Sequence, residues 1–276
     1  MNNPLVIIPS LNSASTLSEV LKGIPKLPVL VIDDGSEDDT AGVAGSLGIM
    51  VVSHETNLGV GAATKTGIRY ALEHGYGPVI SLDSDGQHDP AAVGAFVDRC
   101  PEYDLVIGNR FHDLSPVPSA KLAANLLGSM LFKTTFGVFL PDVACGFRAF
   151  EPAAELLTIP GDSFDFLFNH LALTLSKTGR IGYVSVPVRY DCRQLLCTRR
   201  SELLGALAAV VPYLQLREGI LQAAKREIVS LNESVTAKVD FFTQIESAGF
   251  SGYYFAPHDA YVIQTDIAEG LSFYRR

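Results

Sequence analysis

A pair of carboxylates at the end of an apolar run is the clearest chemical signal in the sequence. Asp83 and Asp85 follow the apolar residues 79–82 and are separated by one residue. Side chains alternate along an extended strand, so both carboxylates are predicted to lie on the same side. Two such charges repel each other, and a hard divalent cation would neutralise them, with Gln87 supplying another oxygen. Mg²⁺ or Mn²⁺ bound to a diphosphate fits this set, whereas the plainer interpretation is an acidic turn.

The residues around this pair predict where it lies in a fold. Asp89 and Pro90 are suited to be the N-cap and first residue of a helix, and apolar residues follow at helical spacing. The carboxylates would then lie at the carboxyl end of a strand that leads into a helix. Open α/β sheets bind their ligands at that edge.

Strands and helices are predicted to alternate over the first half of the chain. Apolar runs of strand character occupy residues 5–8, 29–32, 49–53 and 79–82, and helical patterns lie between them. The second run also ends in paired carboxylates, Asp33 and Asp34. This alternation predicts an α/β fold whose mostly parallel central sheet carries helices on both faces.

A glycine-rich segment, residues 57–63, opens the helix predicted to run to about His74. Gly59 and Gly61 allow close backbone approach, and a helix N-terminus favours negative charge. Phosphate binding and helix packing explain these glycines equally well.

The second half of the sequence predicts further strands and helices. The expected strands are residues 105–107, 142–150 with Arg148 projecting, and 183–190, and the expected helix is 122–136. Phe164, Leu167, Phe168, Leu171 and Leu175 form a stripe expected to be core, with His170 as a structural residue beside it.

Composition limits the classes of function. The chain has 276 residues, 47% of them hydrophobic and 18% charged, which excludes a disordered chain. A formal charge of −9 argues against nucleic acid as a partner. The four cysteines show no CxxC spacing and no secretory signal precedes Leu5, so we expect reduced thiols, no zinc site and a cytoplasmic location.

Six segments occur in an order that carries a family resemblance, over about residues 5–200. They are IPSLN (8–12), IDDGSEDDT (32–40), NLGVGAA (57–63), LDSDGQH (82–88), GNRF (108–111) and CGFR (145–148). The chain resembles the family-two glycosyltransferases of the GT-A fold. It is most similar to the branch of dolichol-phosphate mannose synthases and polyprenyl-phosphate glycosyltransferases.

The resemblance implies a nucleotide-diphosphate sugar, of GDP-mannose or UDP-glucose type, bound across the carboxyl ends of the first strands. The positions it implies for this ligand are Pro9, Leu11, Asn12, Asp33, Asp34, Gly59, Lys65, Asp83 and Ser84. Those it implies for the Mg²⁺ or Mn²⁺ ion are Asp83, Asp85 and Gln87.

The implied reaction is transfer of a hexose with inversion, most simply to a polyprenyl phosphate, whose oxygen is already ionised and needs no base. Asp85 would act through the metal, and the arginines Arg110, Arg148 and Arg193 are candidates to clamp phosphate oxygens rather than form surface salt bridges. A hydroxyl acceptor would require a base, for which Asp142 and Asp165 are the candidates.

Two departures from the family pattern keep alternatives open. Ser13 stands where the family usually has an acidic residue, and Leu196 where it has a glycine in a phosphate-binding segment with Arg193 and Arg199. The alternatives are a nucleotidyltransferase, which releases pyrophosphate, and a degenerate member that binds nucleotide sugar or serves as a scaffold.

The predicted domains are a GT-A domain at 1–200, an apolar helical segment at 201–227 and an appendage of unknown role at 228–276, rich in aromatic residues. Residues 203–216 are apolar but too short to span a bilayer. They would either lie on an anionic membrane surface at the cytoplasmic face or pack on the sheet or in a homodimer interface.

Overall fold

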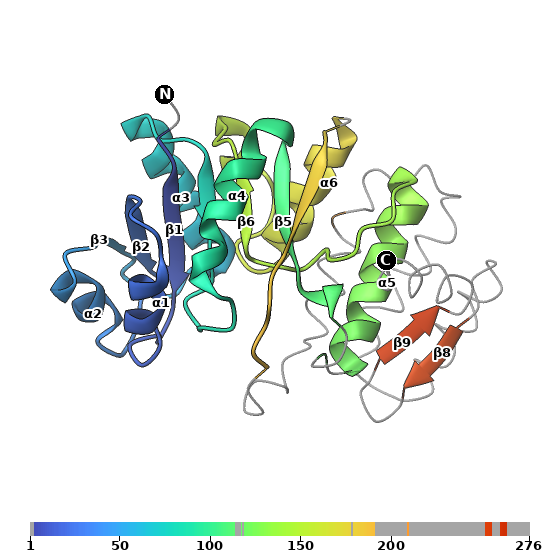
Figure 1. The fold of residues 1–276 in the computed structure, drawn as a ribbon, viewed down its shortest axis with the longest axis horizontal. Coiled ribbons are helices and arrows are strands. Elements are labelled where there is room, and N and C mark those ends of the chain that lie inside the picture. Colours follow the sequence, from blue (N-terminus) through green and yellow to red (C-terminus); the bar gives the residue numbers. More distant parts are fainter. Residues whose placement is uncertain are drawn as a thin grey trace.

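A seven-stranded sheet organises the chain in the computed structural model, which describes residues 3–113, 117, 119–177, 179–190, 209, 252–255 and 260–263 (Figure 1). The strands of this sheet are β1 (Leu5–Ser10), β2 (Val29–Asp33), β3 (Met50–Ser53), β4 (Val79–Ser81), β5 (Leu105–Asn109), β6 (Arg148–Phe150) and β7 (Ile181–Ser185).

The sheet is mostly parallel, as the alternation of strands and helices predicts. Its strand order is β3-β2-β1-β4-β6-β5-β7. β6 runs antiparallel to both its neighbours, β4 and β5, whereas the other pairings are parallel. The carboxyl ends of β1, β2 and β4 therefore meet at one edge, where their following loops can share a ligand.

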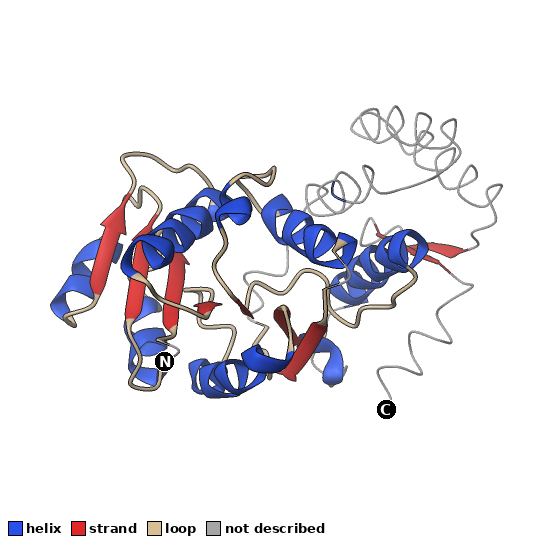
Figure 2. Ribbon diagram, turned by 90° about the horizontal axis from the view of Figure 1, so that it is seen from above, coloured by secondary structure: helices blue, strands red, loops and turns tan. Residues whose placement is uncertain are grey.

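Helices cover both faces of the sheet (Figures 1 and 2). α3 packs against β1, β2 and β4 and also contacts α6, while α4 packs against β4, β6 and β7 on the other side. The helices are α1 (Leu17–Gly23), α2 (Thr40–Ser46), α3 (Val60–His74), α4 (Val93–Arg99), α5 (Ser119–Phe136) and α6 (Asp165–Ser176), with short 3₁₀ turns η1 (Pro90–Ala92), η2 (Cys100–Glu102), η3 (Arg110–His112) and η4 (Ala154–Leu157).

The core consists of the central strands and the helix faces that cover them. Every residue of β1 and β2 is buried, and Leu5 to Ile8 are fully inaccessible. Helices on both sides explain why these strands are continuous apolar runs instead of alternating ones. At the end of β4, Asp89 caps the next turn as predicted, because its carboxylate accepts the Ala91 N–H at 2.9 Å.

Two predicted strands and one predicted core residue differ from what the structure shows. The strand expected over 142–150 is reduced to β6, because the backbone groups of Val143 and Cys145 bond to side chains instead of to a neighbouring strand. The strand expected over 183–190 ends at Ser185, beyond which Val188 makes only an isolated bridge with His88. Phe164, expected in the core stripe, precedes α6 and is 39% exposed.

The later part of the chain is described only in pieces. β8 (Gly252–Phe255) and β9 (Ala260–Ile263) form an antiparallel hairpin, and β9 lies beside α5 (Figure 1). Most of segments 201–227 and 228–276 lies outside the described residues, so these domain boundaries, the apolar segment 203–216 with its membrane or dimer contact, and Arg193, Leu196 and Arg199 stay predictions.

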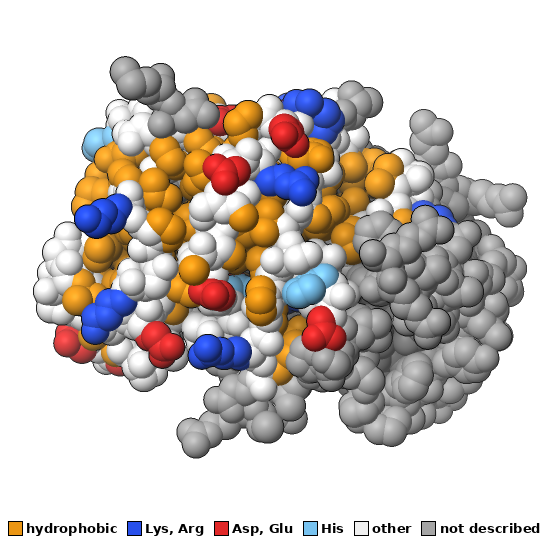
Figure 3. Space-filling view, viewed as in Figure 1, with side chains coloured by type: hydrophobic (Ala, Val, Ile, Leu, Met, Phe, Trp, Pro, Cys, Tyr) orange, Lys and Arg blue, Asp and Glu red, His pale blue; other side chains and the backbone are white. Residues whose placement is uncertain are grey.

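Two features of the described residues concern possible partners: the length of the apolar helices, and the distribution of charged side chains on the face seen in Figure 3. No helix among the described residues is long and apolar enough to cross a membrane. On that face, Lys and Arg side chains are scattered among Asp and Glu (Figure 3).

Candidate active site

The loops after β1 and β2 are joined by side-chain hydrogen bonds. Asn12 adopts a positive φ of 51°, and its backbone N–H donates to Ser36 Oγ at 2.9 Å. The Asn12 side-chain oxygen accepts the Glu37 N–H at 2.8 Å. Pro9 is buried within β1, whereas Leu11 is 41% exposed, so Leu11 and Asn12 are the predicted nucleotide residues of this loop that reach the surface.

Asp33 and Asp34, predicted as a pair, have different surroundings. Asp33 accepts the Ser36 N–H at 3.2 Å and is 7% exposed. Asp34 is 3% exposed and accepts from Leu58 N at 3.0 Å, from Gly59 N at 2.8 Å and from His54 Nδ1 at 2.6 Å. The carboxylate of Asp34 thus anchors the loop that leads into α3, and its contact with the nucleotide stays a prediction.

The N-terminus of α3 is covered by protein. Gly61 and Ala62 donate their N–H groups to the Asp162 carbonyl at 2.9 and 3.2 Å. A side chain at Gly59, whose φ is +103°, would overlap that same carbonyl. This glycine therefore permits the close packing of two loops, and its ligand role stays a prediction.

Lys65 also faces the loop that covers α3. Its Nζ donates to Asp162 Oδ1 at 2.9 Å and lies 5.9 Å from the centre of the Phe166 ring. The ammonium is engaged where α3 meets α6, and the contact of Lys65 with the nucleotide sugar stays a prediction.

The acidic pair lies in the turn after β4. Burial, and after it the nearby charge of Asp85, raises the pKa of Asp83 to about 7. Burial also raises the pKa of Asp85. Asp83 nevertheless keeps 34% of its side-chain exposure, so a ligand can reach it. Gln87 belongs to the same turn, where its N–H donates to Asp85 Oδ1 at 2.9 Å.

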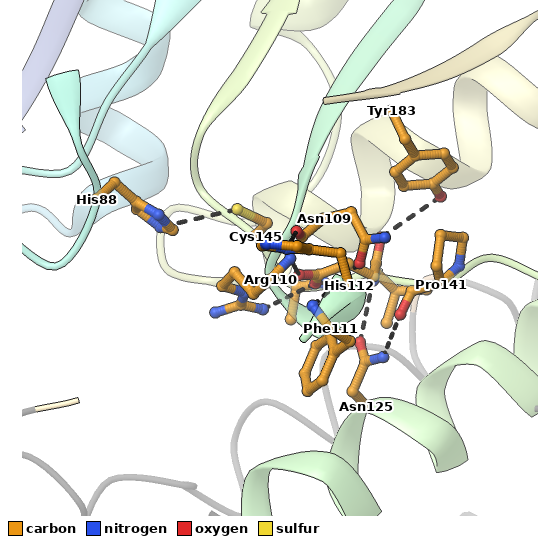
Figure 4. Close-up of polar contacts among 12 residues, drawn as sticks. His88, Asn109, Arg110, Phe111, His112, Asn125, Pro141, Cys145 and Tyr183 are labelled. Atoms are coloured by element: carbon orange, nitrogen blue, oxygen red, sulfur yellow. Dashed lines mark hydrogen bonds and ion pairs between the residues drawn. The ribbon is translucent and has the colours of Figure 1, made fainter. Parts of the chain in front are cut away.

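Gly146, and His88 from the end of the same turn, lie close to Asp83. A side chain at Gly146 would come within 2.5 Å of Asp83 Oδ1, so the glycine permits this approach. His88 Nε2 lies 4.0 Å from Asp83 Oδ2 and 3.8 Å from Cys145 Sγ (Figure 4). Burial lowers the pKa of His88 to about 3, with Arg110 adding to the effect, so this imidazole is neutral.

Arg110 provides positive charge beside the acidic pair. Its guanidinium binds Asp142 through Nε at 2.7 Å and Nη2 at 2.8 Å (Figure 4). Coulombic attraction to Arg110 lowers the pKa of both Asp83 and Asp85, opposing the effect of burial. Arg110 is thus fixed near the acids by a bidentate ion pair. The predicted contact with phosphate would use the N–H donors of the guanidinium that do not bind Asp142.

Arg148 has a structural position, which corrects its predicted role as a phosphate clamp. The side chain is 1% exposed, and burial lowers its pKa to about 10. Its three nitrogens donate to the carbonyls of Cys145 at 2.8 Å, Leu167 at 2.6 Å and Val143 at 2.9 Å. The guanidinium therefore organises the backbone of 143–147 and does not face a ligand.

The two candidate bases are also engaged. Asp142 is fully buried and holds Arg110, and it accepts the backbone N–H of Ala144 at 3.2 Å. Asp165 accepts the Ser163 N–H at 3.0 Å at the start of α6. Their contacts fit structural roles and do not support general-base catalysis. His170, 2% exposed, has the buried position expected of a structural residue.

Lys121, which the sequence analysis did not single out, belongs to the site. Its charge lowers the pKa of both Asp83 and Asp85, and its Nζ lies 4.9 Å from the centre of the Tyr190 ring. Lys121 and Lys133 are the two charged residues of α5, and Lys121 lies in its first turn. That charge is the signal from which the sequence alone would have suggested it.

An asparagine attaches α5 to the loop that carries Asp142. Asn125 Nδ2 donates to the Pro141 carbonyl at 2.6 Å, and its Oδ1 accepts the Val143 N–H at 3.1 Å (Figure 4). These bonds flank Asp142, which in turn holds Arg110. α5 and the carboxyl end of β5 thus bring two cations to the acids at the end of β4.

Comparison with known proteins agrees with this architecture. The mostly parallel sheet, with acidic side chains at its carboxyl edge, belongs to the GT-A class of α/β fold. Glucosyl-3-phosphoglycerate synthase from Mycobacterium tuberculosis, solved in complex with Mn²⁺, UDP and glucosyl-3-phosphoglycerate, matches with a TM-score of 0.60 and 20% identity over 76% of this chain and 80% of that one.

The family follows from the sequence comparison. Glycosyl transferase family 2 matches residues 5–151, and the chain belongs to this family. An uncharacterized protein of Methanocaldococcus jannaschii is 35% identical over 53% of this chain, which spans 63% of that protein. The undecaprenyl-phosphate mannosyltransferase of Micrococcus luteus is 29% identical over 69% of this chain and 84% of its own length.

Proposed function

We propose that the protein transfers a hexose, with inversion, from a nucleotide-diphosphate sugar of GDP-mannose or UDP-glucose type to a polyprenyl phosphate. The observation that carries this proposal is the acidic pair Asp83 and Asp85 at the carboxyl end of β4, opposed by Arg110 and Lys121. Adjacent sites of opposite charge suit a reaction in which a cation and phosphate groups meet.

The residues of the turn fit a divalent cation. Burial, and after it the charge of Asp85, raises the pKa of Asp83, and a bound cation would offset both effects. Within the described residues, no group of three or more His, Cys, Asp or Glu side chains has a metal-holding arrangement. Asp83, Asp85 and Gln87 would therefore supply part of the ligand set, with diphosphate oxygens and water completing it, as Mg²⁺ commonly requires. The bound ion would neutralise charge on the departing diphosphate.

The chain's own cations would orient the phosphate groups. Arg110 is fixed by Asp142 and Lys121 belongs to α5, and the charges of both act on the acidic pair, where phosphate groups of an acceptor or leaving group would bind. An ionised phosphate acceptor needs no general base. The structural contacts of Asp142 and Asp165 are consistent with that choice of acceptor.

The activities of similar proteins support the choice of substrates. The Micrococcus luteus relative is an undecaprenyl-phosphate mannosyltransferase, and the structural neighbour was solved with Mn²⁺ and UDP. The first supports a polyprenyl phosphate acceptor, and the second supports a nucleotide donor with a divalent cation.

A transfer assay tests the proposal. The purified chain is incubated with undecaprenyl phosphate or dolichyl phosphate, Mn²⁺, and GDP-mannose or UDP-glucose labelled in the sugar. We expect the label to enter the lipid phase in one donor series, with release of nucleoside diphosphate. Pyrophosphate release from a nucleoside triphosphate would indicate a nucleotidyltransferase, and nucleotide-sugar binding without turnover across the panel would indicate a scaffold.

A further inference from the structure

Two serine hydroxyls join the loop after β1 to the turn that carries the acidic pair. Ser84 lies between Asp83 and Asp85 in the sequence, and its Oγ is 2.7 Å from Ser13 Oγ. Ser13 is 8% exposed and Ser84 is 7% exposed. A hydrogen bond between such buried groups is shielded from competition with water, so its loss leaves a polar atom unsatisfied.

Either serine hydroxyl can donate the proton of this contact. Ser13 Oγ also lies 3.2 Å from the Leu11 carbonyl, which can accept its proton when Ser84 donates to Ser13. Thr16 Oγ1 adds a second tie, because it donates to the Ser84 carbonyl at 2.7 Å.

Ser13 is itself fixed from the other side. Its backbone N–H donates to Thr40 Oγ1 at 2.8 Å, and the neighbouring Ala14 N–H donates to Asp38 Oδ2 at 3.0 Å. These bonds connect the first loop to the start of α2. The turn at Ser84 is thus tied through Ser13 to two strand ends that lie next to each other in the sheet.

The chemical type of Ser13 matters as well as its position. An acidic residue, usual at this position in the resembled family, would add a third negative charge beside Asp83 and Asp85. Ser13 keeps the contact neutral while still forming a hydrogen bond with Ser84. The acids are thereby held close without further repulsion from this neighbour.

We infer that Ser13 and Ser84 form a positioning pair that holds the Asp83-Ser84-Asp85 turn in the geometry that binds a divalent cation. The inference rests on the proposed function, since it concerns the same cation. Neither serine needs to touch the ion, because each acts through the direction of the flanking carboxylates.

Calorimetric titration of Mn²⁺ tests the pair without relying on turnover. The protein is saturated with UDP or GDP, whichever raises the wild-type Tm more, and Mn²⁺ affinity is compared among the wild type, Ser13→Ala, Ser84→Ala and the double variant. We expect each single change to weaken Mn²⁺ binding about fivefold, the weight of one buried hydrogen bond, and the double variant to be no weaker than the worse single one.

Two further variants separate positioning from general loss of a hydroxyl. Thr16→Val keeps the shape of the side chain but removes the bond to the Ser84 carbonyl, and we expect it to weaken Mn²⁺ binding in the same direction. Ser176→Ala is the matched control, because its hydroxyl bonds to the Leu173 carbonyl at the end of α6. It should bind Mn²⁺ as the wild type does.

The outcomes are distinguishable. Wild-type Mn²⁺ affinity in both single variants, or independent losses that multiply in the double variant, would overturn the pair while leaving the proposed function intact. A wild type that binds neither nucleotide more tightly with Mn²⁺ would overturn the metal role, and the positioning pair with it.

Discussion

The carboxylates near the carboxyl edge of the sheet differ in what surrounds them. Asp34 and Asp142 are neutralised or satisfied by several N–H donors, including a guanidinium for Asp142. Burial instead raises the pKa of both Asp83 and Asp85, and the charge of Asp85 also raises that of Asp83. At the residue scale, this contrast is the reason for placing the proposed cation at this pair.

Asp85→Ala should abolish metal-dependent transfer while leaving the fold intact. Loss of one carboxylate removes a proposed ligand and half of the charge that attracts the cation, so we expect kcat to fall at least about 100-fold. The measurement is the lipid-phase transfer assay, with circular dichroism to check folding. Asp98→Ala, on the exposed side of α4, is the control. Retained turnover in Asp85→Ala would reject the metal role.

The stability of the metal-free protein should depend on pH through Asp83. Its pKa is about 7 in the folded protein and 3.8 in the unfolded chain, so the folded state binds the extra proton. Stability from this group is complete below pH 4 and is lost as pH rises through about 7. In EDTA, the wild-type Tm relative to that of Asp83→Asn should fall by about 3 °C or more between pH 5 and pH 8. A constant difference would contradict the raised pKa.

At the scale of elements, buried backbone contacts decide which segments can approach the acids. In the loop 142–147, the carbonyls of Val143 and Cys145 accept hydrogen bonds from the Arg148 guanidinium instead of pairing with a neighbouring strand. Similarly, the first turn of α3 is held by the carbonyl of Asp162. In both places, polar groups that the sequence predicts to bind a ligand form hydrogen bonds within the protein.

Arg148→Met should destabilise the protein rather than remove phosphate binding alone. The change leaves three buried carbonyls without their donor, and we expect a loss of about 3 kcal/mol or more in the free energy of unfolding. Urea unfolding measures it. A variant of normal stability with selectively lost transfer would restore the clamp role that the structure argues against.

Gly59→Ala should be costly because its position combines a φ of +103° with a neighbouring carbonyl. We expect a loss of about 2 kcal/mol or more in the free energy of unfolding. Gly45→Ala in α2 is the matched control, since nothing lies within 4 Å of the added carbon, and alanine favours a helix. Equal stability of the two variants would show that the contact with Asp162 carries no weight.

At the scale of the whole molecule, the site is assembled from segments far apart in the sequence. The acids come from the end of β4, Arg110 follows β5, and Lys121 comes from α5, which Asn125 attaches to the loop of Asp142. Since β4 and β5 are separated by β6 in the sheet, the site spans three strands. Displacing α5 would therefore alter the charge balance of the acids.

Lys121→Ala should weaken use of the acceptor more than binding of the nucleotide. Removing this cation lowers attraction for an anionic lipid phosphate, and we expect kcat/KM for undecaprenyl phosphate to fall about 10- to 100-fold. The calorimetric Kd for UDP or GDP with Mn²⁺ should change less than about threefold. Lys177→Ala, a cation paired with Glu155 outside the site, is the control. Equal losses for acceptor and nucleotide would refute the assignment.

The sequence by itself determined the order of strands and helices, the edge where ligands bind and the acidic pair. Apolar periodicity and strand-end carboxylates are local properties, and β1 to β4 follow them closely. The orientation of Arg148, the engagement of Asp34 and the approach of Lys121 were decided only in the tertiary structure. Burial and hydrogen-bond partners depend on residues distant in the chain, such as Leu167 for Arg148, so no local pattern specifies them.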